Sequence, residues 1–288
     1  MTPSHLEAKL TRRSELITKF LTDLSVELSR DRRGPLHDEI CTQQKTSGWY
    51  RATTPLESGW HSTLQQMSAA IGHATVFIER INAPDHFATG DLLVRAALEN
   101  LSLVAWLLDE TASVSERSIR ALSEVNYSTG QLKKLYRSQG RNVGNPPFSP
   151  EIQQLVDALD DIKADIARVG GADTKVSFPP RINLIELLFG GPEKPDENGL
   201  IRGSIYRFLS PTSHGTKWSM RHYTSPPSNA GLVSTLASVK HTEMLLFYLG
   251  MAILGVSASA TTQLHWVDLS EGGQQFVGLG LSEIDYDS

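Results

Sequence analysis

The stretch GDLLVRAALENLSLVAWLLDE, residues 90–110, decides the fold class of this chain. Strong helix formers dominate it, and apolar residues occur on nearly every side of the helix that it predicts. A helix without a broad polar face belongs inside a bundle, so we expect this helix to be central. Asp91, directly after Gly90, is predicted to be its N-cap.

Helical spacing of apolar residues continues on both sides of this central stretch. It predicts long helices over 4–29, 61–81, 114–139 and 229–258, and shorter helices over 150–168, 181–189 and 199–209. Strands do not alternate with helices along the chain, which disfavours a nucleotide-binding α/β sheet. The sequence therefore predicts an all-α protein, a multi-helix bundle with a polar C-terminal tail.

The remaining segments are predicted to be connections. The charged run RDRRGPLHDE, residues 30–39, is expected to form a solvated turn, and residues 43–59 a loop that Trp49 and Tyr50 hold against the core. Residues 261–288 are polar and rich in glycine, and predict either a strand at QQFVGLGL or a loose tail. The expected organisation is a bundle over 61–260, with residues 1–60 packed on it, in a single domain overall.

Composition limits the compartment and the partners of the protein. The 288 residues carry a net charge of -5, so binding to nucleic acid would need a local basic patch. Cys41 is the only cysteine, which excludes an intrachain disulfide. The N-terminal stretch lacks the pattern of a signal peptide, and the most apolar run, residues 244–256, is shorter than the roughly 20 residues that span a bilayer. We expect a cytoplasmic protein with no membrane contact.

Several common functional motifs do not occur in the sequence. It contains no phosphate-binding Gly-x-x-x-x-Gly-Lys-Ser/Thr loop, no Glu-x-x-His and no His-Glu-x-x-His. His241 and Glu243 have no third ligand at a useful spacing, so we interpret them as structural or solvated residues. The sequence gives no reason to expect a metal ion or another cofactor.

Two charged residues interrupt the central apolar helix. Arg95 and Glu99 are four positions apart, which places them on one face of the helix. Because an unpaired buried charge is costly, they are expected either to pair with each other or to face a polar cavity. The first alternative is an internal salt bridge, and the second is a pocket wall that offers Arg95 to an anionic ligand.

A second polar group lies in IYRFLSPTSHGTKW, residues 205–218. In a continuous helix, Arg207 and His214 would share a face, about 10 Å apart along the axis, so that both could contact one phosphate. Ser210-Pro211 favours a new helix start or a kink, and helix N-termini attract anions. The alternative is that Tyr206 and His214 only make buried hydrogen bonds at a helix junction. We expect these residues to lie near Arg95 and Glu99.

These two stretches carry a resemblance to known proteins. DLLVRAALENLSLVAWLLDE, followed by SERSIRAL and YRFLSPTSHGTKW, resembles a group of uncharacterised all-helical actinobacterial proteins with an Arg-x-x-x-Glu helix and a Tyr-x-x-Leu-Ser-x-x-x-His-Gly turn. The resemblance covers residues 90–256 and implies no activity. More distantly, Arg207-x6-His214 is similar to the Arg-x4–6-His pattern of HEPN domains. Here the spacing is the longest that the pattern allows, Pro211 lies within it, and Phe208 follows the arginine.

HEPN domains are small helical bundles that often dimerise, and many are metal-independent ribonucleases of toxin–antitoxin and defence systems. The resemblance implies that His214 acts as general base or acid on single-stranded RNA and that Arg207 stabilises the charge of the transition state. Tyr206 or Ser210 would then orient the phosphate. It also implies a homodimer.

Two other functions are consistent with the same residues. Arg95, Glu99, Tyr206 and His214 could line a closed pocket for a small anionic ligand, with binding or an unassigned reaction as its purpose. Alternatively, the bundle could be an interaction module whose amphipathic N-terminal helix binds a partner or a second copy. The exposure of His214 distinguishes a nuclease, which needs an open groove, from a protein with a closed ligand pocket.

Overall fold

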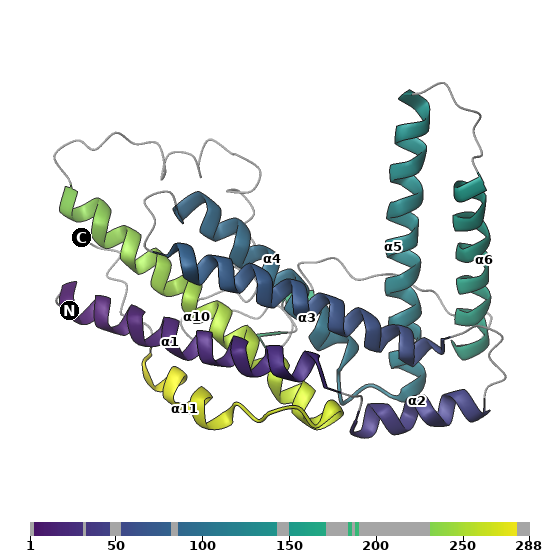
Figure 1. Cartoon of the computed structure of the whole chain (residues 1–288), viewed down its shortest axis with the longest axis horizontal. Helices are drawn as coiled ribbons and strands as arrows, with labels where there is room; N and C mark the ends of the chain where they lie inside the picture. The colour runs from purple at the N-terminus through teal and green to yellow at the C-terminus, as the bar shows by residue number, and fades with distance from the viewer. Residues whose placement is uncertain are drawn as a thin grey trace, which may run out of the picture.

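The computed structural model describes residues 3–30, 33–46, 53–81, 86–142, 150–170, 184–185, 188–189 and 231–280. Within these residues the chain forms eight α-helices and no strand, which confirms the predicted all-α fold (Figure 1). The helices are α1 (Pro3–Leu28), α2 (Pro35–Thr46), α3 (Pro55–Arg80), α4 (His86–Leu107), α5 (Val114–Asn142), α6 (Pro150–Gly170), α10 (Gly231–Leu264) and α11 (Ser270–Gly278). The helix predicted over 199–209 lies outside the described residues, and only four residues of the one predicted over 181–189 are described.

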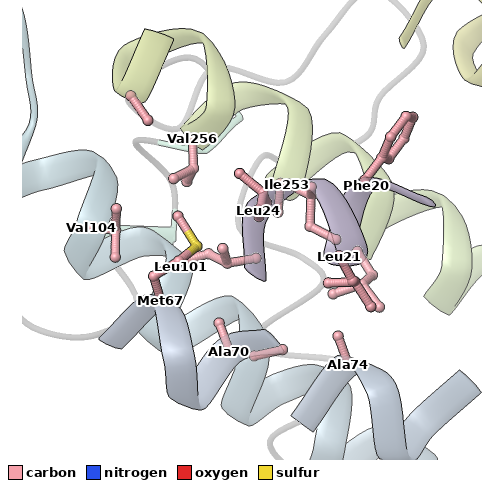
Figure 2. Packing of buried hydrophobic residues seen from close by; sticks show 14 of the residues in the cluster. Phe20, Leu21, Leu24, Met67, Ala70, Ala74, Leu101, Val104, Ile253 and Val256 are labelled. Carbon is pink, nitrogen blue, oxygen red and sulfur yellow. The ribbon is translucent and has the colours of Figure 1, made fainter. Parts of the chain in front are cut away.

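The main core lies between α1, α3, α4 and α10 (Figure 2). α4 is central, as predicted, because its Val94, Ala97, Leu98 and Val104 are completely buried. Figure 2 shows Leu101 and Val104 of α4 beside Met67 of α3 and Val256 of α10. The hydrophobic effect of this shared burial holds the four helices together.

The place of α5 in the bundle differs from the prediction. The helical spacing over 61–81, 90–110, 114–139 and 229–258 predicts that these four helices form the main bundle. No described residue of α5, however, belongs to the main core. Its Ala121 and Leu122 pack in two smaller clusters, of which the second joins α5 to α6. α1 takes the fourth position, since its Ile17, Phe20 and Leu24 are almost fully buried in the main core.

Two prolines begin helices where the sequence predicted connections. Pro35 begins α2 directly after Gly34, whose φ of 82° lies in the left-handed region, and Pro55 begins α3. Proline suits a first helical position because its missing N–H needs no partner there and its φ is already helical. The Thr54 side chain accepts a hydrogen bond from the backbone N–H of Glu57 and caps α3. The turn predicted over 30–39 and the loop over 43–59 are therefore wrong where these helices lie, and Trp49 and Tyr50 fall outside the described residues.

α4 begins earlier than the sequence predicted. Its first residue is His86, so Asp91 lies inside the helix rather than at its N-cap. The side chain of Asp91 is completely buried and is bonded to His241 of α10. The Asp91 carboxylate thus has a partner from another helix, which the order of residues along α4 could not reveal.

α5 begins at Val114, as predicted, and reciprocal capping explains this start. The backbone N–H of Glu116 donates to the Ser113 hydroxyl, while the Glu116 carboxylate accepts from the backbone N–H of Ser113. The bond from the Ser113 backbone lowers the pKa of Glu116. A carboxyl group with a lowered pKa stabilises the fold above its ordinary pKa, and this contribution is lost as the pH falls through the folded value.

α5 pairs with α6, and the two helices project away from α1 and α10 (Figure 1).

α10 is longer than predicted, because it continues to Leu264 instead of ending near residue 258. Its residues His241–Leu264 are long and apolar enough to cross a membrane, with a mean hydropathy of 1.8 over the best window. The expectation that this run is too short to span a bilayer is therefore wrong. Half of that window is buried inside the bundle, and a core helix passes the same test of length and composition, so this is weak evidence for a membrane span.

The C-terminal segment forms a docked helix instead of a strand or a loose tail up to residue 280. α11 packs through Phe276, whose ring is completely buried. This ring stacks on Phe247 with the centroids 6.3 Å apart, and meets Phe20 edge to face at 6.2 Å. Leu269, Gly273 and Phe276 are buried at helical spacing, which explains why this stretch winds onto the bundle.

Gly250 of α10 makes the docking of α11 possible. A Cβ atom built on Gly250 would lie 2.1 Å from the nearest carbon of the Phe276 ring, where no side chain fits. We predict that Gly250→Ala lowers the free energy of unfolding by about 1–3 kcal/mol, measured by urea denaturation, because the ring or the helix must shift.

The matched control is Gly72→Ala on the exposed side of α3, where an added Cβ meets nothing within 4 Å. This variant should raise the free energy of unfolding by roughly 0.5–1 kcal/mol, because alanine is the better helix former. Equal effects of the two substitutions would show that α11 does not depend on the space at Gly250.

Candidate functional site

The described residues contain only part of the predicted site. Tyr206, Arg207, Ser210 and His214 lie outside them, so their contacts with Arg95 and Glu99 stay a prediction. Arg95 and Glu99 themselves are described, on the third and fourth turns of α4.

Arg95 and Glu99 pair with each other on a half-buried face of α4. The Arg95 Nε donates to Glu99 Oε1 over 2.9 Å, and the side chains are 17% and 24% exposed. Of the two alternatives that the sequence leaves open, the structure thus shows Arg95 and Glu99 paired with each other, in a half-buried position. Leu92, one turn before Arg95, is 46% exposed, so this part of the α4 surface is partly open to solvent.

A histidine–aspartate contact joins α4 to α10, one turn before Arg95. The Nε2 of His241 lies 2.6 Å from Oδ1 of Asp91, whose side chain is completely buried, while that of His241 is 16% exposed. Asp91, Arg95 and Glu99 follow at intervals of four residues, so they form a polar stripe along an otherwise apolar helix. This spacing, which continues the Arg95–Glu99 interval toward the N-terminus, could have marked Asp91 as a member of the stripe, although it does not indicate His241 as its partner.

Glu243, two residues after His241, belongs to a separate buried cluster. Glu243 Oε1 lies 2.8 Å from Lys9 Nζ and 3.4 Å from Arg13 Nη1, and all three side chains are at most 7% exposed. Two cations from α1 thus meet one carboxylate from α10. The interpretation of His241 and Glu243 as structural residues agrees with these pairs. No group of three metal-ligating side chains occurs among the described residues.

Arg13 is the most constrained member of this cluster, which we call the Arg13 cluster (Lys9, Arg13, Glu243). Its guanidinium lies 5.1 Å from the ring centroid of Phe247 and 5.5 Å from that of Phe276, and it donates to the carbonyl of Gly280. Burial lowers the pKa of Arg13 from its ordinary value, and the Glu243 carboxylate offsets part of this effect. The cluster therefore connects α1, α10 and the end of α11.

Sequence reasoning missed the Arg13 cluster because it assigned the charges of the first helix to the solvent side. The apolar stripe of that helix runs through Leu10, Ile17, Phe20 and Leu24 at alternating spacings of three and four. Arg13 occupies the position of this series between Leu10 and Ile17. A charged residue in a core position was the available signal.

A groove with a volume of about 890 Å³ runs along the exposed side of α1, beside the end of α3 and the start of α10. Among its described lining residues, the acidic side chains of Glu7, Glu15 and Asp23 outnumber the basic one of Lys19. Arg95 and Glu99 do not contribute to it. This groove is therefore distinct from the predicted site, and its charge does not suit an anionic ligand.

The described residues that come just before the Arg207–His214 motif in the sequence pack on α4 and α10. Leu184 is buried with Trp106 and Leu107 of α4, and the ring of Phe189 lies 5.7 Å from that of Tyr248 on α10. The next described residue after Phe189 is Gly231, which begins α10. Both described flanks of residues 190–230 thus belong to the part of the bundle that carries Arg95, Glu99 and His241.

A scan against protein-family models, a search of curated proteins and a search of solved structures found no match to this chain. The resemblance to HEPN domains therefore depends on the sequence motifs alone.

The Arg13 cluster generates a stability prediction. Glu243→Gln removes the carboxylate that both Lys9 and Arg13 contact and leaves two buried cations without it. We expect a loss of about 3–5 kcal/mol in the free energy of unfolding, because breaking a buried ion pair leaves uncompensated charge. Urea denaturation followed by circular dichroism measures this loss.

The matched control is Glu15→Gln, which removes a carboxylate that pairs with Arg12 on the exposed face of α1. Both side chains of that pair are more than half exposed, so its loss should cost less than about 1 kcal/mol. A similarly small effect of Glu243→Gln would mean that the two cations of the Arg13 cluster do not depend on this carboxylate.

Proposed function

We propose that this chain is an HEPN-like helical protein that cleaves single-stranded RNA without a metal ion, as ribonucleases of toxin and defence systems do. The observation that carries the proposal is the Arg207-x6-His214 pair, which occurs in a chain whose described part is an all-α bundle. The packing of Leu184 and Phe189 on α4 and α10 supports it, because these two helices also carry the described polar residues of the candidate site.

In the proposed reaction, His214 removes the proton from a ribose 2′-hydroxyl, and the resulting oxyanion attacks the adjacent phosphorus. An imidazole suits this role because it titrates near neutral pH. The bond from phosphorus to the 5′-oxygen of the next nucleotide then breaks, and an acid returns a proton to that oxygen. Arg207 stabilises the negative charge that develops on the phosphorane oxygens, and Tyr206 or Ser210 orients the phosphate.

The test is cleavage of a labelled single-stranded RNA by purified protein in the presence of a metal chelator. Wild-type protein should cleave the RNA, and His214→Ala should abolish cleavage. Arg207→Ala should lower the rate on the order of 10²–10³-fold, the usual effect of removing one group that stabilises the transition state. The chelator silences contaminating nucleases that depend on metals.

Matched controls are His61→Ala and Arg12→Ala, which alter an exposed histidine of α3 and an exposed arginine of α1. Both should cleave RNA as wild type does. Equal cleavage by wild type and His214→Ala would show that the activity does not belong to this site. If His214→Ala fails to fold, the structural role of His214 at a helix junction is favoured instead.

A second candidate function is the binding of a small anionic ligand in a closed pocket, and the half-buried Arg95–Glu99 pair favours it. A guanidinium held in a partly buried position by one carboxylate can exchange part of that contact for a phosphate or carboxylate of a ligand. In this function Tyr206 and His214 would bind the ligand rather than catalyse cleavage.

This second function predicts a shift in thermal stability. Nucleoside monophosphates and inorganic phosphate should raise the Tm of the wild type, since a ligand at 100 times its Kd stabilises a protein by about 2.7 kcal/mol. Arg95→Gln should remove this rise. The control Arg120→Gln alters another half-buried arginine, paired with Asp109, and should leave the rise unchanged. An unchanged rise with Arg95→Gln would contradict this function.

A further inference from the structure

The second half of α5 is exposed on nearly all sides. Seven of the eight residues from 131 to 138 are exposed and one is half-buried. This part of the helix pairs with α6 and projects beyond the main bundle (Figure 1). Packing within the fold therefore explains little of the amino-acid composition of residues 131–138. These side chains are instead available for contacts with other molecules in solution.

The charges of this region have one sign. From Val125 to Pro150 the sequence contains four basic residues, Lys133, Lys134, Arg137 and Arg141, and no acidic residue. The chain as a whole is acidic, with a net charge of -5. This is the local basic patch that binding to a polyanion needs in an acidic protein.

Three of the basic side chains are neighbours on the surface of α5, because Lys133 and Lys134 are four and three positions before Arg137. Leu122 packs with Ile162 of α6, and from that contact side Lys134 lies about 120° and Arg137 about 60° around the helix. We call Lys133, Lys134 and Arg137 the basic face.

Lys134 and Arg137 are the members of the basic face that are available to a ligand. Both are exposed, and neither forms an ion pair with any described residue. Lys133 lies closer to α6: the pKa of Asp160 is lowered first by its hydrogen bond from Lys163 and to a smaller extent by the charge of Lys133. Among the described residues, these two cations thus have no acidic partner.

An aromatic ring and a flat stretch of helix adjoin the basic face. Tyr127 is 37% exposed and lies seven residues, about two helical turns, before Lys134. Gly130 lies between them and meets no atom within 4 Å of the position where a Cβ would be. Aromatic rings beside cations are typical of surfaces on which single-stranded nucleic acid stacks its bases and pairs its phosphates.

We propose that the basic face binds the phosphates of single-stranded RNA, with Tyr127 as a stacking platform for one base. This inference rests on the proposed nuclease function and adds to it a substrate-binding surface on α5. Lys134 and Arg137 contact successive phosphates, and the smooth surface at Gly130 lets the strand pass close to the helix. The occupant is a polyanion because the face offers uncompensated positive charge.

The test is the binding of wild-type full-length protein to a fluorescein-labelled RNA whose 2′-oxygens are methylated. Such RNA lacks the nucleophile of the proposed cleavage, so binding is measured without any change to His214. Lys134→Gln/Arg137→Gln should raise the Kd on the order of tenfold at low salt. It should also reduce the slope of log K against log salt by about 1.4, or about 0.7 for each phosphate contact with a single strand.

Tyr127→Ala should weaken binding by about fivefold or more, the low end of base stacking, while Tyr127→Phe should retain the wild-type affinity. The matched control is Arg12→Gln/Lys163→Gln, which removes the same charge from exposed positions on α1 and α6. This control should keep both the affinity and the salt slope. Circular dichroism and Tm verify that every variant is folded.

Equal binding by the basic-face variant and the control variant would overturn the inference, as would the absence of RNA binding by the wild type. If the basic-face variant changes a dimer into a monomer in sedimentation and keeps its RNA affinity, the face binds a second copy and the inference is wrong. Binding through the basic face without any cleavage of unmodified RNA would overturn the nuclease function alone. Cleavage of unmodified RNA with unchanged binding by the variant would overturn only the inference.

Discussion

The buried charge of Arg13 constrains how α1, α10 and α11 meet. A guanidinium that is fully removed from water must find partners in the protein, and here these are the Glu243 carboxylate, the Gly280 carbonyl and the faces of two phenylalanine rings. Each partner comes from a segment distant in sequence from α1. The three segments can therefore dock in only one register without leaving the charge unpaired, and Phe276 fits over Gly250 only in that register.

Two of the buried polar contacts of the bundle meet on one short segment of α10, residues 241–243. His241 binds Asp91 on one side of the helix, and Glu243 binds the two cations of α1. α10 is otherwise so apolar that packing alone would specify its rotation and its position along the axis only loosely. The two polar clusters supply that specification, because a shift of one turn would separate both sets of partners.

The proposed function joins two regions of different character. The polar stripe of α4 belongs to the rigid main core, whereas the basic face of α5 stands on a hairpin that touches the bundle mainly through α3. A catalytic group must be held by well-packed elements, and a surface that binds a long polyanion must be accessible over several nucleotides. The division of the chain into a core and a projecting hairpin is suited to both requirements.

The sequence by itself determined the all-α class, the central position of α4, the start of α5 and the place of Arg95 and Glu99 on one face of α4. These features depend on local periodicity and on contacts within one helix, which residue order contains. It did not reveal the helices that begin at Pro35 and Pro55, because proline marks both the end of one element and the first turn of another. Only the tertiary structure decided that Asp91 binds His241, that Arg13 is buried and that α11 docks as a helix. In each case the stabilising partner lies on another element far away in sequence, and no local pattern records which distant residue will satisfy a buried charge.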